Sequence, residues 1–593
     1  MTATVNGVEL LSSPGTRFLR NVILVDDRAL AGGSGDQSSS DSALVNVAVP
    51  DEVVAQFDGG DKEPSSDDGV PDPIPSRVAP RSPLDDLLGD TLGPSGDIDT
   101  AALVDAFADI GIACAIMAPE TAEGDDRRRI LQLANRSDIV ILDWILASRD
   151  GSHRVSSDSL IREIVEQDKL VGGRLRLLCV YTTDPDLGAV QRTILRSLES
   201  VYKDEDVEAT DSDGRLLICG PHLRVVIYAK PVRRVRDNIV TEAELPARLV
   251  SDFNEFSRGL LSGLVLHSLG VVKDEAHRLL ARFPDELDAP YLSHRAMVGP
   301  VQAEQFALQL VSDELGSVLS SANVQAAVHQ AQVERRLEYL LPRQRSPRAK
   351  LGNKYVSLDR DSTFQLLSEV PDDKTVSLTD GEARSMKKFR NYTSLLVESE
   401  ERANELDHSF AALSCLARNP KFELESAPPP VLALGTLVQR VFDPRTDSDQ
   451  PPVGDRYFLC LQPLCDTVRL SGPTPFPFIP LLGRTEGDTK PFNIVTFAPQ
   501  IGGGSAERCY LSTTGKRIRD LKMMEFTPNT ERFVGAVWDA AGGAWLFRDT
   551  RGDAYWWLGD LRTDHGHRMA GNFGSMLGRI GLDESEWLRL MAE

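Results

Sequence analysis

The chain has 593 residues, which is long enough for several folded domains. Hydrophobic residues make up 41% of it, enough for packed cores, and 89 acidic residues against 65 basic ones give a net charge of −24. Such a charge opposes unspecific binding to the nucleic-acid backbone, so we expect no nucleic-acid partner.

The cysteines and the apolar segments bear on location. Seven cysteines are few, and most lie in apolar runs such as "LLCVY", which predicts reduced thiols and a cytoplasmic protein. The N-terminal stretch "MTATVNGVELLSSPG" lacks the basic start and apolar core of a secretion signal. The longest apolar-rich stretch, residues 259–272, is too short and too interrupted to span a bilayer, so we expect no membrane association.

The first predicted element is a buried strand within "FLRNVILVDDRAL", residues 18–30. It ends in two adjacent carboxylates, Asp26 and Asp27, which repel each other and lose solvation if they are buried. Either the strand ends there and both side chains face water, or the pair serves a site. The rest of the sequence has to decide between these interpretations.

Residues 31–98 are rich in Gly, Ser, Pro and Asp, with 14 acidic residues against 3 basic ones. Such a composition cannot bury enough apolar surface to offset the entropy of ordering it. We interpret this segment as a long, partly disordered insertion.

Helical and strand patterns then alternate along the chain. Amphipathic periods predict helices, and continuous apolar runs predict buried parallel strands. The predicted helices are 99–111, with Asp99 or Thr100 as N-cap and Gly111 as the stop, 125–136, 157–169 and 187–200, and the predicted strands are 112–119, 137–146, 175–183 and 223–232. With the opening strand, this alternation predicts an α/β fold with a doubly wound five-stranded parallel sheet.

The second half of the chain has different patterns. Residues 240–425 are predicted to be a helical region with a basic linker near 342–354, and the helices at 240–340 are interpreted as packing elements or as elements of a homodimer. From 430 to 593, short apolar strands rich in aromatic residues, such as "AYWWLGDL", predict a mostly β C-terminal domain of unknown role.

Polar residues follow the strands of the predicted parallel sheet, at the edge where ligands bind in such folds. The first strand ends in Asp26 and Asp27, the third in Asp143, the fourth in Thr182 and the fifth in Lys230. Carboxylates this close together need an offsetting charge, and Mg²⁺ prefers carboxylate oxygens. The sequence therefore predicts a magnesium site with a hydroxyl and a lysine available for phosphoryl oxygens.

This order of residues resembles the active site of response-regulator receiver domains, which have a flavodoxin-like fold. The resemblance covers residues 18–235. It implies that Asp143 is the nucleophile that accepts a phosphoryl group from a histidine kinase. It also implies that Thr182 binds a phosphoryl oxygen and that Lys230 pairs with the phosphoryl group.

The same resemblance implies the metal ligands. Asp27 would bind Mg²⁺ directly and Asp26 through water, with Asp143 and the backbone carbonyl of Ile145 as further ligands. The two adjacent carboxylates would then be present to hold a metal.

The sequence departs from the family pattern at several positions. Three residues before the lysine the family has Tyr or Phe, whereas this chain has Ile227, with Tyr228 on the opposite face of the strand. Ala147 replaces the usual proline. The resemblance implies that Ile145 and Asp184 flank the phosphoryl group, where Ile145 could exclude the hydrolytic water or Asp184 could position it.

Other motifs are weaker signals. Cys460 and Cys465 lack a second pair of zinc ligands, His565 and His567 are more typical of a polar loop, and the glycines at 501–505 lack the lysine of a phosphate-binding loop. No other catalytic motif is found, so the only catalytic activity we expect is phosphorylation and dephosphorylation of the receiver itself.

The tripeptide "LDW", the insertion and the C-terminal "YFLCLQPLCDTVRL" also resemble the large receiver proteins of bacterial anti-phage two-component systems of the Detocs type. That resemblance implies a phosphoryl sink or signal regulator that works with a histidine kinase and a second regulator or effector. The alternative is an effector enzyme whose C-terminal domain is switched by phosphorylation. A DNA-binding regulator is disfavoured by the charge and by the lack of a basic recognition helix.

Overall fold

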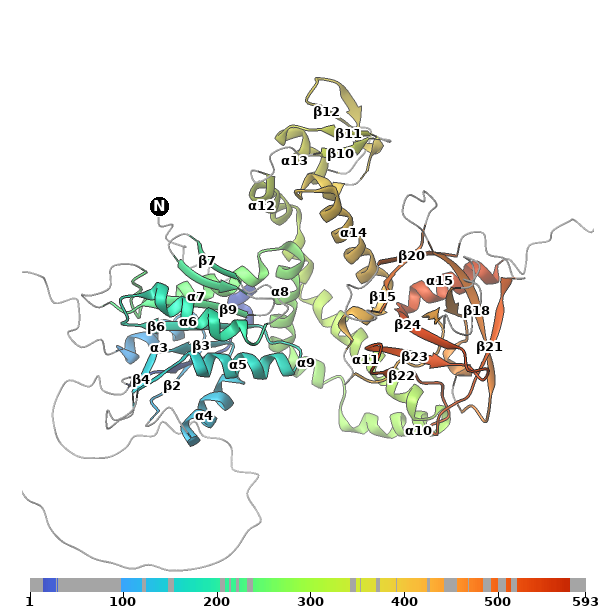
Figure 1. Cartoon of the computed structure of the whole chain (residues 1–593), viewed down its shortest axis with the longest axis horizontal. Helices are drawn as coiled ribbons and strands as arrows, with labels where there is room; N and C mark the ends of the chain where they lie inside the picture. Colours follow the sequence, from blue (N-terminus) through green and yellow to red (C-terminus); the bar gives the residue numbers. More distant parts are fainter. Residues whose placement is uncertain are drawn as a thin grey trace, which may run out of the picture. The chain divides into compact units, whose positions relative to one another are not determined.

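The structure is a computed structural model that describes residues 14–27, 29, 98–119, 124–147, 154–202, 208–212, 215–219, 223–231, 238–341, 348–351, 354–369, 374–390, 392–423, 427–441, 456–467, 469–483, 492–499, 508–513 and 520–575 (Figure 1). The insertion proposed at 31–98 therefore lies almost entirely outside the described residues. The chain divides into two compact units, Met1–Lys273 and Asp274–Glu593.

The N-terminal unit is built on a seven-stranded sheet in the order β2-β1-β3-β6-β9-β8-β7. Its first five strands in that order pair in parallel. They are β2 (Ala113–Met117), β1 (Asn21–Val25), β3 (Ile139–Leu142), β6 (Arg176–Thr182) and β9 (Leu223–Ala229). The predicted doubly wound five-stranded parallel sheet is confirmed.

Two further strands were not predicted. β7 (Glu208–Ser212) and β8 (Arg215–Cys219) form an antiparallel hairpin, and β8 also pairs antiparallel with β9. The sequence of β7, "EATDS", is polar and lacks the apolar alternation that marks a strand, which explains why pattern reasoning missed it. The hairpin covers the β9 edge of the parallel sheet.

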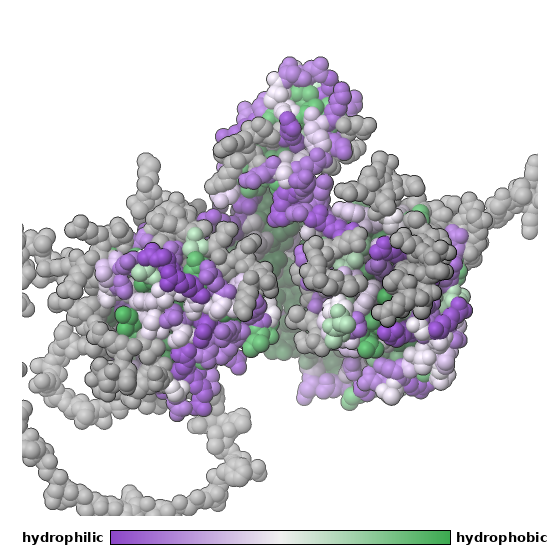
Figure 2. All heavy atoms as spheres, viewed as in Figure 1, coloured by the Kyte–Doolittle hydropathy of each residue, from purple (hydrophilic) through white to green (hydrophobic). Residues whose placement is uncertain are grey.

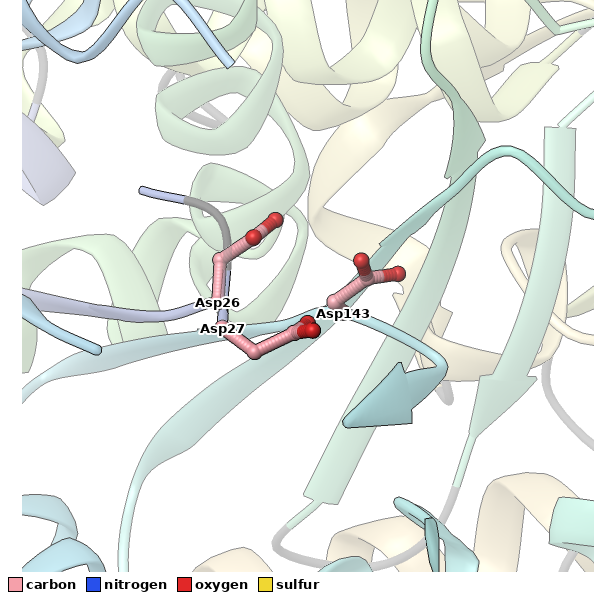
Figure 3. Close-up of side chains that lie close together, drawn as sticks. All are labelled: Asp26, Asp27 and Asp143. Atoms are coloured by element: carbon pink, nitrogen blue, oxygen red, sulfur yellow. The ribbon is translucent and has the colours of Figure 1, made fainter. Parts of the chain in front are cut away.

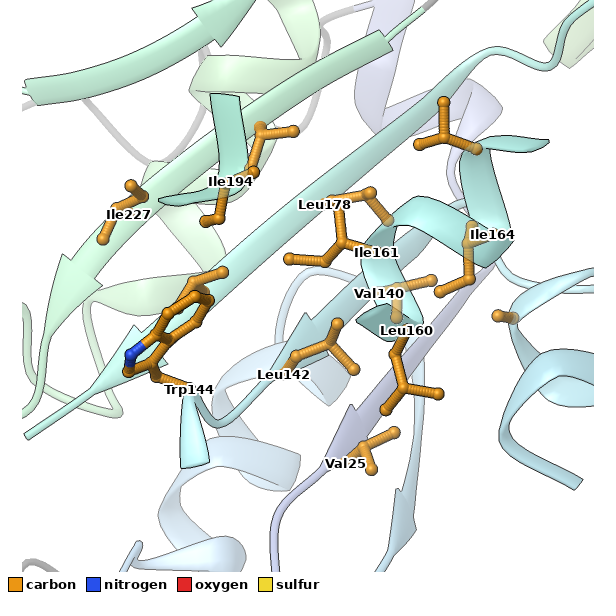
Figure 4. Close-up of a cluster of buried hydrophobic side chains, with 14 of the residues drawn as sticks. Val25, Val140, Leu142, Trp144, Leu160, Ile161, Ile164, Leu178, Ile194 and Ile227 are labelled. Carbon is orange, nitrogen blue, oxygen red and sulfur yellow. The ribbon is translucent and has the colours of Figure 1, made fainter. Parts of the chain in front are cut away.

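Helices cover both faces of this sheet. α3 (Thr100–Ala108), α7 (Leu245–Asn254) and α8 (Leu260–Asp274) contribute to one core. α4 (Gly124–Ala134), α5 (Asp158–Leu170) and α6 (Leu187–Glu199) contribute to the other core, part of which is drawn in Figure 4. Alternate residues of β1 enter opposite cores, as Leu24 and Val25 do. Burial on both faces explains why the strand sequences are continuously apolar.

The expected cap of the first long helix is confirmed. The Asp99 carboxylate accepts a hydrogen bond from the Ala102 N–H at 3.0 Å, which satisfies one of the free donors of α3. The helix ends at Ala108, and Gly111 follows with φ of +73°, a conformation that glycine adopts at little cost.

The strand predicted at 137–146 is shorter in the structure. β3 ends at Leu142, and after Asp143 and Trp144 the chain forms a separate hairpin of β4 (Ile145–Ala147) and β5 (Arg154–Ser156). The apolar run gave no sign of this break, because Leu142 and Trp144, on either side of Asp143, are both buried although the strand has ended.

The second unit begins with helices: α9 (Ala276–Leu280), α10 (Asp288–Val298), α11 (Pro300–Ser321), α12 (Gln330–Leu340), α13 (Arg360–Ser368) and α14 (Glu400–Cys415). Between α12 and α14 the structure differs from a purely helical region, because two small antiparallel sheets occur there. One contains β11 (Lys354–Ser357), β10 (Arg348–Leu351) and β14 (Phe389–Arg390), and the other β12 (Thr375–Ser377) and β13 (Ala383–Ser385). Part of the predicted basic linker thus forms β10.

The C-terminal part of this unit is a ten-stranded antiparallel sheet, which confirms the mostly β prediction. Its strands are β15 (Leu416–Arg418), β16 (Thr436–Arg440), β17 (Tyr457–Cys460), β18 (Thr474–Gly483), β19 (Ile494–Phe497), β20 (Arg508–Ser512), β21 (Lys522–Phe526), β22 (Val537–Asp539), β23 (Ala544–Arg548) and β24 (Ala554–Leu561), and α15 (Thr563–Gly574) follows. Neighbouring residues enter two different cores, as Leu437 and Val438 do. Both faces of this sheet are therefore covered.

The described surface seen in Figure 2 is largely hydrophilic, with scattered hydrophobic residues. Among the helices that the structure describes, none has both the length and the apolar character needed to cross a membrane.

Candidate functional site

Three carboxylates meet where β1 and β3 end (Figure 3). Asp26 and Asp27 follow β1, Asp143 follows β3, and one carboxylate oxygen from each lies within 4.8 Å of the others. The register explains the meeting: Val25 and Leu142, the last residues of the two strands, are partners, and the Asp143 N–H donates to the Val25 carbonyl at 3.0 Å. The sheet thus brings together residues more than a hundred positions apart in the sequence.

Lys230 joins this cluster from the end of β9. Its Nζ lies 2.6 Å from Asp26 Oδ2 and 2.9 Å from Asp143 Oδ2, and its side chain is 2% exposed. The Lys230 backbone N–H donates to the Thr182 carbonyl at 2.8 Å, which continues the pairing of β6 with β9. The lysine therefore reaches the carboxylates from a fixed backbone position.

Thr182 is the last residue of β6 and is buried. Its hydroxyl oxygen accepts a hydrogen bond from the Asp184 N–H at 3.0 Å. A hydroxyl group can accept and donate at the same time, so the Thr182 proton can still be donated to an oxygen of a bound ligand.

The electrostatics of the cluster depend on burial. Burial raises the pKa of Asp143 to about 6; Lys230 opposes this rise, and the charges of Asp26 and Asp27 add to it. Burial also works against the charge on Lys230, but Asp143 and Asp26 outweigh it and raise the lysine pKa. When ionised, three carboxylates and one ammonium leave two negative charges, which is the charge that one divalent cation balances.

The donor set fits Mg²⁺, which binds to carboxylate oxygens and keeps some of its water ligands. Among the described residues, the only group of three or more His, Cys, Asp or Glu side chains close enough to share a metal is Asp26, Asp27 and Asp143. Ile145, whose carbonyl was predicted as a further ligand, opens β4 two residues after Asp143 and is 41% exposed. Its role as a ligand stays a prediction.

The sequence did not indicate that Ser157 also supports the site. Its hydroxyl donates to the backbone carbonyl of Asp143 at 2.5 Å, and Ser157 itself is fully buried. The Ser157 N–H donates to the Trp144 carbonyl at 2.9 Å. The start of α5 is thus tied to the residue that would act as nucleophile, and only the β4–β5 hairpin brings the two together.

The two residues before Ala229 lie on opposite faces of β9, as predicted. Ile227 belongs to the core under α4, α5 and α6 and is fully buried. Tyr228 lies in the other core, where its hydroxyl donates to Asp252 of α7 at 2.5 Å. The aromatic side chain nearest the lysine in sequence is therefore fixed against α7 by a buried hydrogen bond.

The weaker candidates are placed as follows. Cys460 is buried in β17 and Cys465 is exposed, His565 is buried in α15 and His567 is exposed. None of these belongs to a metal-competent group among the described residues. The glycines at 501–505 lie outside the described residues.

Comparison with known proteins gives one positive result. Residues 18–235 match the family model of the response receiver domain. The curated proteins and the solved structures yield no match to this chain. The chain therefore carries a receiver domain, which supports a response-regulator receiver protein, and the match covers the whole sheet that holds the aspartates and Lys230.

Proposed function

We propose that the protein accepts a phosphoryl group on Asp143 from a partner histidine kinase. The observation that carries this proposal is the convergence of Asp26, Asp27 and Asp143 around the ammonium of Lys230 at the carboxyl ends of parallel strands. Phosphoryl transfer needs a nucleophile, a cation and donors to the phosphoryl oxygens, and this cluster offers carboxylates that can serve as nucleophile and metal ligands together with an ammonium.

Each residue has a defined task in the transfer. A carboxylate oxygen of Asp143 attacks phosphorus while the bond from phosphorus to the donor nitrogen breaks, and the departing imidazole takes up a proton from solvent. The hydroxyl proton of Thr182 and the ammonium of Lys230 are available to phosphoryl oxygens. A Mg²⁺ ion held by Asp26, Asp27 and Asp143, with the carbonyl of Ile145, would neutralise charge on the transferring oxygens.

The test is phosphoryl uptake from acetyl phosphate in the presence of Mg²⁺, measured by intact mass. Wild type should gain one phosphoryl group, and Asp143→Asn should gain none because an amide cannot form an acyl phosphate. Asp125→Asn, which changes an 88% exposed carboxylate of the same unit, should behave like wild type. Equal labelling of wild type and Asp143→Asn would contradict the proposal.

We further propose that the protein is a phosphoryl sink or signal regulator of an anti-phage two-component system that contains a second regulator or effector. The support is its resemblance in sequence to large receiver proteins of Detocs-type systems. A sink requires rapid loss of the phosphoryl group, so the labelled protein should decay within minutes and refill from the kinase. A phosphorylated form that is stable for hours would instead favour a switch, as the effector alternative requires.

The cellular test uses the genes of the complete system. If the protein drains phosphoryl groups, Asp143→Asn should slow cell growth in the absence of phage, because phosphoryl groups that are no longer drained then activate the effector. Toxicity of the phosphomimetic Asp143→Glu in this protein expressed alone would instead assign the effector activity to its own C-terminal part.

A further inference from the structure

Ser157 occupies the position before α5 at which a serine usually caps a helix. A capping serine has an extended backbone and accepts a hydrogen bond from an N–H of the first turn. The side chain of Ser157 makes no such bond, and its backbone is helical, with φ of −73° and ψ of −4°. Its hydroxyl donates instead to the Asp143 carbonyl at 2.5 Å. The serine therefore departs from the usual local role of its position in order to contact the residue of the phosphoacceptor site.

The carbonyl that accepts this hydroxyl lies just past the end of a strand. The pairing of β3 with β1 and with β6 ends at Leu142. The Asp143 N–H still donates to the Val25 carbonyl, but the chain then leaves the sheet. A buried carbonyl without a donor is costly, and Ser157 supplies the donor that the sheet no longer provides. Both backbone polar groups of Asp143 are thus held, one by β1 and the other by the start of α5.

The residues that follow Asp143 are fixed by the same part of the chain. The Ser157 N–H donates to the Trp144 carbonyl at 2.9 Å. The Trp144 side chain is buried in the core that Figure 4 draws in part. Ile145 then pairs with Ser156 in the hairpin of β4 and β5. The peptide group between Asp143 and Trp144 consequently has little freedom to turn.

The position of α5 itself does not depend on the Ser157 hydroxyl. The helix buries Leu160, Ile161, Ile164 and Val165 in the core beneath the sheet. Its first turn is closed by the Ile161 N–H, which donates to the Ser157 carbonyl at 2.9 Å. Replacing the hydroxyl would leave these contacts in place, so its specific effect falls on Asp143.

We propose that Ser157 is a positioning residue for phosphoryl transfer, which holds the backbone of Asp143 so that its carboxylate is aligned for attack. This inference rests on the proposed function of Asp143. Lys230 holds one oxygen of the carboxylate at 2.9 Å, while Val25 and Ser157 hold the backbone to which the side chain is attached. A misplacement of about 1 Å can slow a reaction about a hundredfold. Because Lys230 stays in place, we expect a smaller loss when the hydroxyl alone is removed.

The test compares the kinetics of phosphoryl uptake from acetyl phosphate, with Mg²⁺, in wild type and in variants of Ser157. Ser157→Ala should lower the maximal rate constant about tenfold and change the half-saturating donor concentration less than about twofold, because Ser157 does not take part in donor binding. Ser157→Thr keeps the hydroxyl and should recover most of the rate. Ser157→Cys, which has only a weak donor, should be intermediate.

The neighbouring serine provides the matched control. The hydroxyl of Ser156 is buried and has no hydrogen-bond partner among the described residues, so Ser156→Ala should take up phosphoryl groups at the wild-type rate. A second measurement needs neither Mg²⁺ nor a donor. In Mg²⁺-free protein, hydrogen exchange of peptides that contain residues 143–146 should be faster in Ser157→Ala than in wild type and unchanged in Ser156→Ala.

The outcomes separate this inference from the function on which it rests. Uptake at the wild-type rate by a folded Ser157→Ala would overturn the inference and leave the role of Asp143 intact. A Ser157→Ala that unfolds at a lower temperature but keeps the wild-type rate would overturn it as well, because the bond would then serve stability alone. No uptake by the wild type would overturn the proposed function and this inference with it.

Discussion

Lys230 is the residue on which the charge balance of the phosphoacceptor site depends. Its ammonium lies between Asp26 and Asp143 and is almost fully removed from water. A buried charge left without its partner is far more costly than the intact pair is stabilising. The contribution of Lys230 to stability therefore shows itself when the lysine is removed.

We predict that Lys230→Met lowers the free energy of unfolding of the N-terminal unit by about 3–5 kcal/mol in the absence of Mg²⁺. The carboxylates of Asp26 and Asp143 then lose the ammonium that lies between them. Adding Asp143→Asn to the same chain removes one of them and should restore part of the loss. Denaturant unfolding measures both effects, and a double variant as unstable as Lys230→Met would contradict the explanation.

The buried His408 of α14 should make the stability of the fold depend on pH. The side chain is buried between Phe497 and Tyr510, and its Nε2 lies 3.1 Å from the Thr496 carbonyl. Burial lowers its pKa to about 4; the bond to Thr496 opposes the shift, and two nearby cations, Arg508 and Lys421, add to it.

The sign of the pH effect follows from that pKa. Between pH 6.5 and 4 the unfolded chain binds a proton at His408 and the folded chain does not, so stability is lost as the pH falls. In this window His408 lowers the free energy of unfolding by at most about 1.4 kcal/mol for each unit that the pH falls, and above pH 6.5 it causes no pH dependence. His408→Leu should flatten the pH dependence of unfolding in this window, and an equal slope in both proteins would refute the prediction.

At the scale of elements, close packing of α8 on the start of the chain extends the N-terminal unit to Lys273. Leu266 of α8 is buried in the core beneath the parallel sheet. A Cβ atom added to Gly270 would lie 3.0 Å from Arg17 Cγ and 3.2 Å from the Arg17 carbonyl carbon and oxygen. The helix can approach α2 (Pro14–Phe18) this closely only because this position lacks a side chain.

We therefore predict that Gly270→Ala destabilises the N-terminal unit, even though alanine has the better helix propensity by about 1 kcal/mol. The matched control is Gly316→Ala in α11, where an added Cβ meets no atom within 4 Å. That change should be neutral or stabilising. Thermal unfolding distinguishes the two variants, and a stabilised Gly270→Ala would show that α8 shifts freely.

At the scale of the whole molecule, the two compact units should respond separately to ligands. We predict that calorimetry resolves two transitions and that Mg²⁺ raises only the one that belongs to the N-terminal unit. At a hundred times its dissociation constant a ligand stabilises the folded state by about 2.7 kcal/mol. Asp27→Asn should abolish this shift, and a shift of both transitions would contradict the assignment.

The homodimer stays a prediction. Light scattering can test it by measuring the molar mass of the protein in solution.

The sequence by itself determined the alternation of helices and strands in the N-terminal half and the order of the site residues along it. Continuous apolar runs such as "VILV" and "IVIL" can be recognised as strands from the sequence, because strands buried on both faces need no polar positions. The end of each run then marked Asp26, Thr182 and Lys230, since ligands bind at the carboxyl ends of parallel strands. The mostly β character of the C-terminal part could also be predicted, because its strands are short apolar runs rich in aromatic residues.

Tertiary structure alone decided the rest. β7 has no apolar pattern of its own and joins the sheet through β8, which pairs with β9, so the sequence did not indicate this hairpin. The hydrogen bond of Ser157 to Asp143 and the cavity that Trp538, Trp545 and Trp557 help to line depend on which elements meet in space. Local periodicity records which faces are buried, whereas the identity of the neighbour across an interface is set only when the chain has folded.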